Sequence, residues 1–90
     1  MKVTVSVKIF GIVQGVFYRK STYDKAIELG VVGWVKNCDD GTVEALFQGT
    51  QVQVDTILDW CHEGPERAIV SGIEVNIINS IKDFDSFSII

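Results

Sequence analysis

The chain of 90 residues has little of what would hold a metal ion or cross-link a fold. Its two cysteines, Cys38 and Cys61, are too few for a disulfide framework, and neither lies in a CxxC motif. The single histidine, His62, stands beside Cys61, and this pair lacks the ligand number and spacing of a zinc site. We therefore expect no metal ion and no cofactor, and we expect both cysteines to be reduced and packed.

Long hydrophobic runs and an excess of basic residues are absent too. No apolar run approaches the roughly 20 residues that cross a membrane, and the first residues alternate as in a strand rather than forming a signal peptide. The net charge of −4 disfavours nucleic acid and anionic membranes as partners. We expect a soluble, cytoplasmic monomer that folds as a single domain over residues 1–90 and binds neither nucleic acid nor a membrane.

What is present is a regular pattern of hydrophobic residues, which make up 47% of the chain. Alternating and helical spacings predict strands at Lys2–Phe10, Val31–Cys38, Thr42–Gln48, Ile69–Ile78 and Phe84–Ile90, and helices at residues 19–30 and Gln51–Glu63. The order is βαββαβ with a short fifth strand. Two helices with apolar stripes and an antiparallel sheet with one apolar face predict an α+β, ferredoxin-like sandwich, in which both helices cover one face of the sheet.

Local signals support these boundaries. Asp39-Asp40-Gly41 between two strand-like runs is typical of a hairpin, although the register of its two strands stays open. Gly30 is a plausible end for the first helix, and Gly64-Pro65 ends the second. In the fourth strand, Ile73, Val75 and Ile77 share one face, and Trp34 is expected in the core or at its edge.

The segment Gly11-Ile12-Val13-Gln14-Gly15-Val16-Phe17-Tyr18-Arg19 joins the first strand to the first helix. Its two glycines let the backbone turn and aim successive N–H groups inward. The helix N-terminus adds unpaired donors and a partial positive charge, and Arg19, one of only two arginines, adds a fork of N–H donors. Together they favour a site for a dianionic phosphoryl group. A tight turn with a solvated arginine is the alternative.

A second segment runs from Gly33 to Glu44 and contains Asn37. Asparagine is depleted in strands, yet Asn37 lies in a strand-like run. Its amide can donate and accept hydrogen bonds at once, so it can hold a water molecule. A strand end that already bends into its turn would explain the same residue without any function.

Together the two segments resemble the signatures of acylphosphatases. Gly11-x-Val13-Gln14-Gly15-Val16-x-Tyr18-Arg19-x-x-Thr22 is similar to the first signature, and Gly33-Trp34-Val35-Lys36-Asn37-x-x-x-Gly41-Thr42-Val43-Glu44 is similar to the second. The resemblance covers essentially the whole chain. It implies hydrolysis of a small acyl phosphate to a carboxylate and inorganic phosphate, without a metal ion or cofactor.

The resemblance also implies a role for each site residue. Arg19 would bind the phosphoryl oxygens, and Asn37 would position the attacking water. The backbone N–H groups that would share the phosphoryl group are those of Gln14, Gly15, Val16, Phe17 and Tyr18. The mixed anhydride already has a good leaving group, so the site has to hold the phosphoryl group, balance its charge and aim the water. No carboxylate stands out as a base.

The chain departs from the family pattern at three places. Tyr18 stands where phenylalanine is usual, which adds a hydroxyl that needs a partner or water. Cys38 follows Asn37 where threonine or serine is common, so a hydrogen-bonding hydroxyl near the site is lost. The chain ends in Phe87-Ser88-Ile89-Ile90, without the basic and aromatic residues often found there, which bears on the stability of the edge strand.

Two other functions compete with this interpretation. A non-catalytic domain that binds phosphate or another small anion would keep the loop and Arg19 but would not need Asn37, and turnover of a simple acyl phosphate separates it from an enzyme. An RNA-binding module of similar topology is disfavoured by the acidic charge and by the lack of an aromatic and basic signature on the central strands. A salt-dependent RNA shift would favour it.

Overall fold

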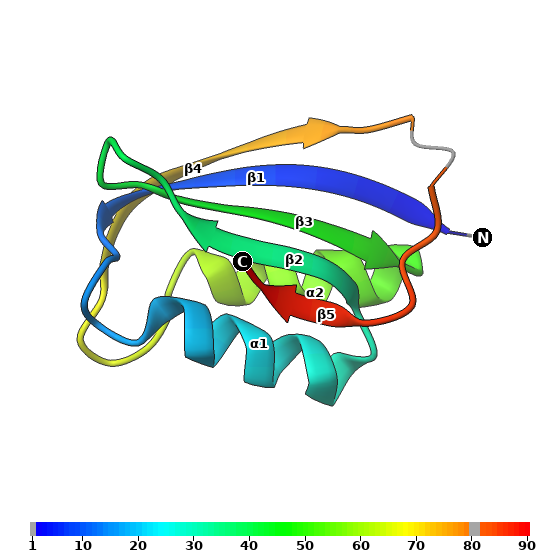
Figure 1. The fold of residues 1–90 in the computed structure, drawn as a ribbon, viewed down its shortest axis with the longest axis horizontal. Helices are drawn as coiled ribbons and strands as arrows, with labels where there is room; N and C mark the ends of the chain where they lie inside the picture. The colour runs from blue at the N-terminus through cyan, green and yellow to red at the C-terminus, as the bar shows by residue number, and fades with distance from the viewer. Residues whose placement is uncertain (1, 80–81) are drawn as a thin grey trace.

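A computed structural model describes residues 2–79 and 82–90, which form a five-stranded sheet with both helices against one of its faces (Figure 1). The strand order is β4-β1-β3-β2-β5. The elements are β1 (Val3–Ile12), α1 (Tyr18–Leu29), β2 (Val32–Asn37), β3 (Val43–Gly49), α2 (Gln51–Cys61), β4 (Ile69–Ile77) and β5 (Phe87–Ile89). The predicted ferredoxin-like arrangement of strands and helices is confirmed.

The pairing of β5 with its neighbour differs from the other strand pairings of the sheet. The pairs β1–β3, β1–β4 and β2–β3 are antiparallel, as predicted, whereas β5 runs parallel to β2. The predicted strand Phe84–Ile90 is also shorter, because only Phe87–Ile89 pairs with β2. Phe87 anchors β5, since its ring stacks on Phe47 at 5.9 Å between centroids. The sheet is therefore mixed at this edge, and β5 carries the C-terminal residues alongside β2.

Local signals mark the ends of both helices. Gly30 ends α1 in a left-handed conformation (φ 79°), as expected for a glycine at this position. Thr50 begins α2 with a capping box, in which its hydroxyl accepts from the Gln53 N–H and the Gln53 amide oxygen accepts from the Thr50 N–H. Helix α2 ends at Cys61, two residues before the predicted end, because the chain turns through Gly64 (φ 68°).

The hairpin register decides which face of β2 meets the helices. Val35 lies opposite Ala45 and Asn37 opposite Val43, so these side chains share the face that the helices cover. Trp34 lies on the other face of β2 and is only partly buried, so the prediction that it belongs to the core or its edge is wrong. The core between sheet and helices is made of buried aliphatic and aromatic residues, among them Val5, Val7, Ile9, Val43, Ala45, Phe47, Val54, Ile57 and Cys61.

Strand β4 leaves much of its apolar face open. The register sets Val75 opposite Val7 and Ile77 opposite Val5, so the predicted common face of this strand is also the face of the buried β1 residues. Yet Ile77 is 80% exposed and Val75 is 42% exposed. The periodicity of the sequence predicted the face correctly but not its burial, because neither helix covers this edge. No helix in the described part of the chain is long and apolar enough to cross a membrane.

Candidate active site

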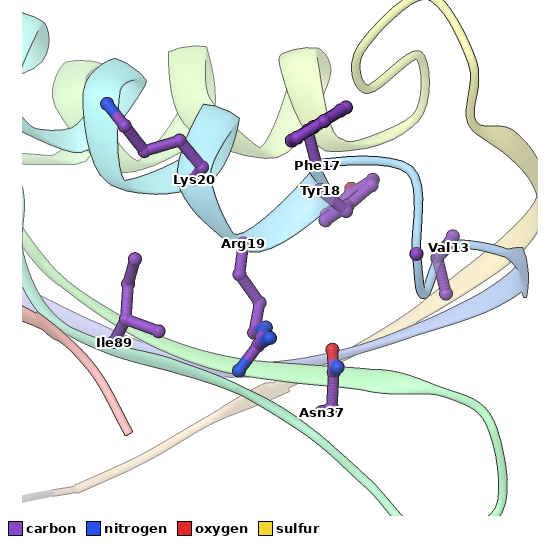
Figure 2. A pocket seen from close by; sticks show the side chains of 8 residues that line it. Val13, Phe17, Tyr18, Arg19, Lys20, Asn37 and Ile89 are labelled. Atoms are coloured by element: carbon purple, nitrogen blue, oxygen red, sulfur yellow. The ribbon is translucent and has the colours of Figure 1, made fainter.

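A pocket of about 310 Å³ opens beside the start of α1, next to β2 and β5 (Figure 2). Its lining consists of Val13, Gly15, Phe17, Tyr18, Arg19, Lys20, Asn37 and Ile89. The fold thus brings Arg19 and Asn37, which come from the two separate signature segments, to one cavity. Gln14 and Val16 do not line it. Their expected contribution is a backbone N–H group, and that contribution stays a prediction.

The two glycines of the loop have different tasks. A side chain at Gly11 would collide with the carbonyl of Ile69, where β1 and β4 continue to pair beyond a register shift. Gly11 therefore serves the close approach of two strands. Gly15 has open space around its Cα position, but its φ of 76° is one that L side chains rarely adopt. Gly15 is the glycine that turns the chain toward the helix.

The backbone of the turn leaves donors available. Phe17, at the N-cap of α1, has φ 66° and ψ 22°, so the left-handed conformation recurs two residues after Gly15. The N–H groups of Gly15 and Val16 donate no hydrogen bond within residues 2–79 and 82–90. Helix α1 also lacks a side-chain cap and has no acidic residue in its first turn. A helix N-terminus without these partners offers its donors and its partial positive charge to an anion.

Arg19 supplies a full positive charge to the pocket. Its side chain is half-buried and runs from the first turn of α1 toward Asn37 (Figure 2). Within the described residues no carboxylate forms an ion pair with it, although acidic residues outnumber basic ones in the chain. The neighbouring Lys20, by contrast, pairs with Asp24 at 2.7 Å. The guanidinium fork is therefore available for a phosphoryl group.

Asn37, the last residue of β2, has an amide that points into the same pocket (Figure 2). Its Oδ1 atom is buried and has no hydrogen-bond partner among the described residues. An unsatisfied buried acceptor costs on the order of 1–3 kcal/mol. A bound water molecule or ligand would remove this cost, so the arrangement is better suited to a polar guest than to folding alone.

The side chain of Gln14 has a role that sequence reasoning missed. Its Nε2 donates to the carbonyl of Cys38 at 2.7 Å and to the carbonyl of Thr42 at 2.9 Å. These carbonyls flank the hairpin turn that directly follows Asn37. Gln14 therefore ties the loop to the hairpin and fixes the two walls of the pocket relative to each other. A donor-rich amide in the loop was the available signal, but its partners depend on the fold.

The carboxylate of Asp40, which lies in the hairpin turn close to Asn37 in the sequence, makes its contacts within and beside that turn. Its Oδ1 accepts hydrogen bonds from the hydroxyl of Thr42 at 2.6 Å and from the Thr42 N–H at 3.0 Å, and its Oδ2 pairs with Lys8 at 3.0 Å. These hydrogen bonds from Thr42, followed by the interaction with Lys8, hold the pKa of Asp40 well below its usual range. Asp40 is thus a fixed carboxylate of the hairpin.

Tyr18 connects the start of α1 to the end of α2. Its buried hydroxyl donates to the carbonyl of Cys61 at 2.7 Å, and its ring lies 5.6 Å from that of Trp60. The hydroxyl that departs from the family pattern therefore has a protein partner, and a carbonyl at the helix C-terminus is satisfied. Burial, with the interaction with Cys61, raises the pKa of Tyr18 far above its usual range. A side chain at Gly64 would approach the Tyr18 ring to 2.6 Å, so the glycine is needed there.

The cysteines contribute no nucleophile to the pocket. Neither forms a disulfide within the described residues; Cys61 is buried in the core and Cys38 is partly buried, so the expected packing holds fully only for Cys61. Burial raises the pKa of Cys61 to about 12, so it remains a thiol near neutral pH. Residues 2–79 and 82–90 contain no group of three or more His, Cys, Asp and Glu side chains that could hold a metal ion.

Known proteins share both the sequence and the fold of this chain. The family model for acylphosphatase matches residues 5–89. An acylphosphatase of Marinobacter nauticus is 46% identical over 79 residues, an alignment that covers 88% of this chain and 86% of the relative.

Solved structures agree. The structure of an acylphosphatase from Coxiella burnetii has a TM-score of 0.93 at 36% identity, covering 98% of this chain and 92% of the other. That of the acylphosphatase from Bacillus subtilis has a TM-score of 0.94 at 31% identity, covering 98% of each chain. The resemblance found in the two signature segments, and the prediction of an acylphosphatase enzyme that rests on it, are confirmed. This chain belongs to the acylphosphatase family.

Proposed function

We propose that this protein hydrolyses an acyl phosphate to a carboxylate and inorganic phosphate, and that no metal ion or cofactor takes part. One observation supports the proposal above all. The guanidinium of Arg19 and the unpartnered amide oxygen of Asn37 face the same pocket. A site that only binds an anion needs the first group but not the second, whereas hydrolysis needs both.

The phosphoryl group is held by Arg19 and by the loop backbone. Arg19 binds two phosphoryl oxygens through its fork of N–H groups. The N–H groups of residues 14–18 bind the remaining charge, assisted by the partial positive charge at the start of α1. These donors are fixed before the reaction begins, so they stabilise the charge of the transition state without reorganisation.

Asn37 holds the attacking water in line with the bond that breaks. The water oxygen bonds to phosphorus while the bond between phosphorus and the acyl oxygen breaks, and the carboxylate leaves with the electron pair. The two protons of the water stay on the phosphate product, which can release one of them to the solvent. A carboxylate is stable in water, so the leaving group needs no acid. Positioning of the nucleophile and charge balance are the two contributions required of the protein.

A hydrolysis assay tests the proposal. Acetyl phosphate serves as the substrate, in the presence and absence of a chelator, with inorganic phosphate as a competitive inhibitor. We expect turnover that the chelator leaves unchanged, because the described residues hold no metal-ligand cluster, and inhibition by phosphate. Phosphate binding without turnover would support a non-catalytic anion-binding domain instead. Activity that disappears with the chelator and returns with a divalent ion would contradict the mechanism.

A further inference from the structure

Strand β4 runs along one margin of the molecule and forms an edge of the sheet (Figure 1). Among the described strands it pairs with β1 alone, and every residue from Glu74 to Ile77 is exposed. The side chains of Val75 and Ile77 lie on the side of the sheet that carries the helices, yet they are 42% and 80% exposed. An edge strand of this kind presents unpaired backbone groups with which another strand can pair.

The usual protection of an edge strand is largely missing from residues 73–77. This segment contains neither lysine nor proline, and its only charged residue is Glu74. The register shift between β4 and β1 follows Phe10, whose partner is Gly72, so the pairing is regular from Gly72 to the end of the strand. Residues 73–77 are therefore a straight, mostly apolar edge that nothing in the described part of the chain covers.

The pairing with β1 shows which backbone groups of β4 are free. The N–H of Ile78 donates to the carbonyl of Thr4, just before β1 begins to pair in register. In an antiparallel pair, residues that bond to the partner strand alternate with residues whose N–H and C=O point away from it. Ile73, Val75 and Ile77 therefore direct their backbone groups outward. The residues with free backbone groups are thus the ones whose apolar side chains lie on the helix side of the sheet.

We propose that this edge binds a second copy of the chain, and that the two β4 strands pair antiparallel about a twofold axis at Val75. Ile73 of each copy then lies opposite Ile77 of the other, and the outward N–H and C=O groups of both copies pair with each other. The apolar side chains meet on the helix side of the sheet. On the other side Glu74 of each copy lies opposite Asn76 of the other, so like charges do not meet.

Charge and strand length favour this register over its neighbours. A twofold axis at Glu74 would set the two Glu74 carboxylates directly opposite each other, which is unfavourable. An axis at Ile73 would draw the irregular stretch around Gly72 into the pairing. An axis at Asn76 would set Ile73 opposite residue 79, which lies beyond the end of β4. The axis at Val75 pairs the whole regular edge and avoids these costs.

The resulting dimer is closed and leaves the active-site pocket open. Each copy uses its β4 edge, so the pairing stops at two chains and builds one continuous sheet. The pocket lies toward the other edge of the sheet, beside β2 and β5. This dimer differs from the monomer expected from the sequence, because the sequence shows the apolar face of β4 but not its exposure.

Sedimentation of the full chain, from micromolar to millimolar concentration at physiological salt, tests the proposal. We expect the mass to rise with concentration from that of one chain to that of two, and no further. Val75→Lys sets two ammonium groups opposite each other and raises the dimer dissociation constant at least about tenfold. The matched control is Ile27→Lys, which leaves this constant unchanged, because Ile27 is 57% exposed on α1, the helix that packs on β2 and β5. Thermal unfolding confirms that each variant is folded.

Disulfide cross-linking tests the register itself. In a Cys38→Ser background, Val75→Cys should join two copies under mild oxidation, because facing Cα atoms of a hydrogen-bonded pair lie about 5.5 Å apart, within the range of a disulfide. Ile77→Cys should not, since the two copies of this residue lie about 14 Å apart along the strands. The buried Cys61 remains in both variants.

The proposal is overturned if the parent chain stays at the mass of one chain up to millimolar concentration, in which case β4 is a solvated edge. Growth beyond two chains, or a dimer that Val75→Lys leaves intact, also overturns it. Unless Val75→Cys cross-links faster than Ile77→Cys, the register is wrong.

Discussion

Removing the Tyr18 hydroxyl should destabilise the fold without disabling the site. Tyr18→Phe keeps the ring and its packing against Trp60, and only the hydrogen bond to the Cys61 carbonyl, 2.7 Å long, is lost. The carbonyl is then a buried acceptor without its partner, which costs about 1–3 kcal/mol. For a domain of this size each kcal/mol lowers the melting temperature by roughly 4–8 °C. We expect a decrease of at least about 4 °C.

Thermal unfolding followed by circular dichroism measures this effect, with Tyr23→Phe as the control. Tyr23 packs edge-on against Phe87, and its hydroxyl makes no hydrogen bond in the described part of the chain, so its loss leaves the melting temperature nearly unchanged. Turnover per folded molecule stays close to that of the parent for Tyr18→Phe, because the hydroxyl points to α2 and not to the phosphoryl group. Equal melting temperatures for Tyr18→Phe and the parent would refute the reasoning.

Three further predictions address the charge of Arg19, the hydrogen bonds of the loop residue Gln14 and the pH dependence of stability. Arg19→Ala lowers kcat/KM for acetyl phosphate by at least about 10²-fold. Arg19→Lys restores little of this activity, because an ammonium lacks the planar fork of N–H donors. Full activity in the lysine variant would show that charge alone matters. Gln14→Leu removes the two hydrogen bonds to the Cys38 and Thr42 carbonyls and lowers the free energy of unfolding by about 1–3 kcal/mol. Urea titration measures this change. An unchanged urea midpoint would mean that these hydrogen bonds do not contribute to stability. Because burial raises the pKa of Cys61 from 9.0 to about 12 in the folded protein, the thiol's contribution to stability is complete below pH 9 and is lost as the pH rises toward 12. Urea unfolding from neutral to alkaline pH should show a steeper loss for the parent than for Cys61→Ala, and parallel curves would contradict this.

Much of the fold could be predicted because local signals agree with one another. The strict alternation of β1, the Asp-Gly turn after β2, Gly30 after α1 and Gly64-Pro65 after α2 each specify one element or boundary. The parallel direction of β5 could not be predicted, because three residues carry too little pattern to specify a partner. Nor could the exposure of Ile77, since periodicity identifies a shared face and not what covers it.

The candidate site was predictable to a different extent. The signature segments named Arg19 and Asn37, and the fold brings them to one pocket. The side chain of Gln14 contacts residues 24 and 28 positions further along the chain. The hydroxyl of Tyr18 contacts a residue 43 positions further along. Such contacts depend on hairpin register and helix packing, which a single sequence leaves open. Ile89 was missed for the same reason, because its place at the pocket follows from the direction of β5.

The central claim is that Arg19 and the loop hold the phosphoryl group while Asn37 holds the water. Asn37→Ala tests it most directly, with the inhibition constant for inorganic phosphate, the turnover of acetyl phosphate and the melting temperature all measured on the same variant. The account predicts that phosphate binds with nearly the parent affinity while turnover falls by about 10²-fold or more, because a misplaced nucleophile loses several kcal/mol of the rate enhancement. Asn37→Asp, which adds a negative charge beside a dianion, does no better. Normal turnover by folded Asn37→Ala, with only its melting temperature lowered, would remove Asn37 from the mechanism and contradict the account.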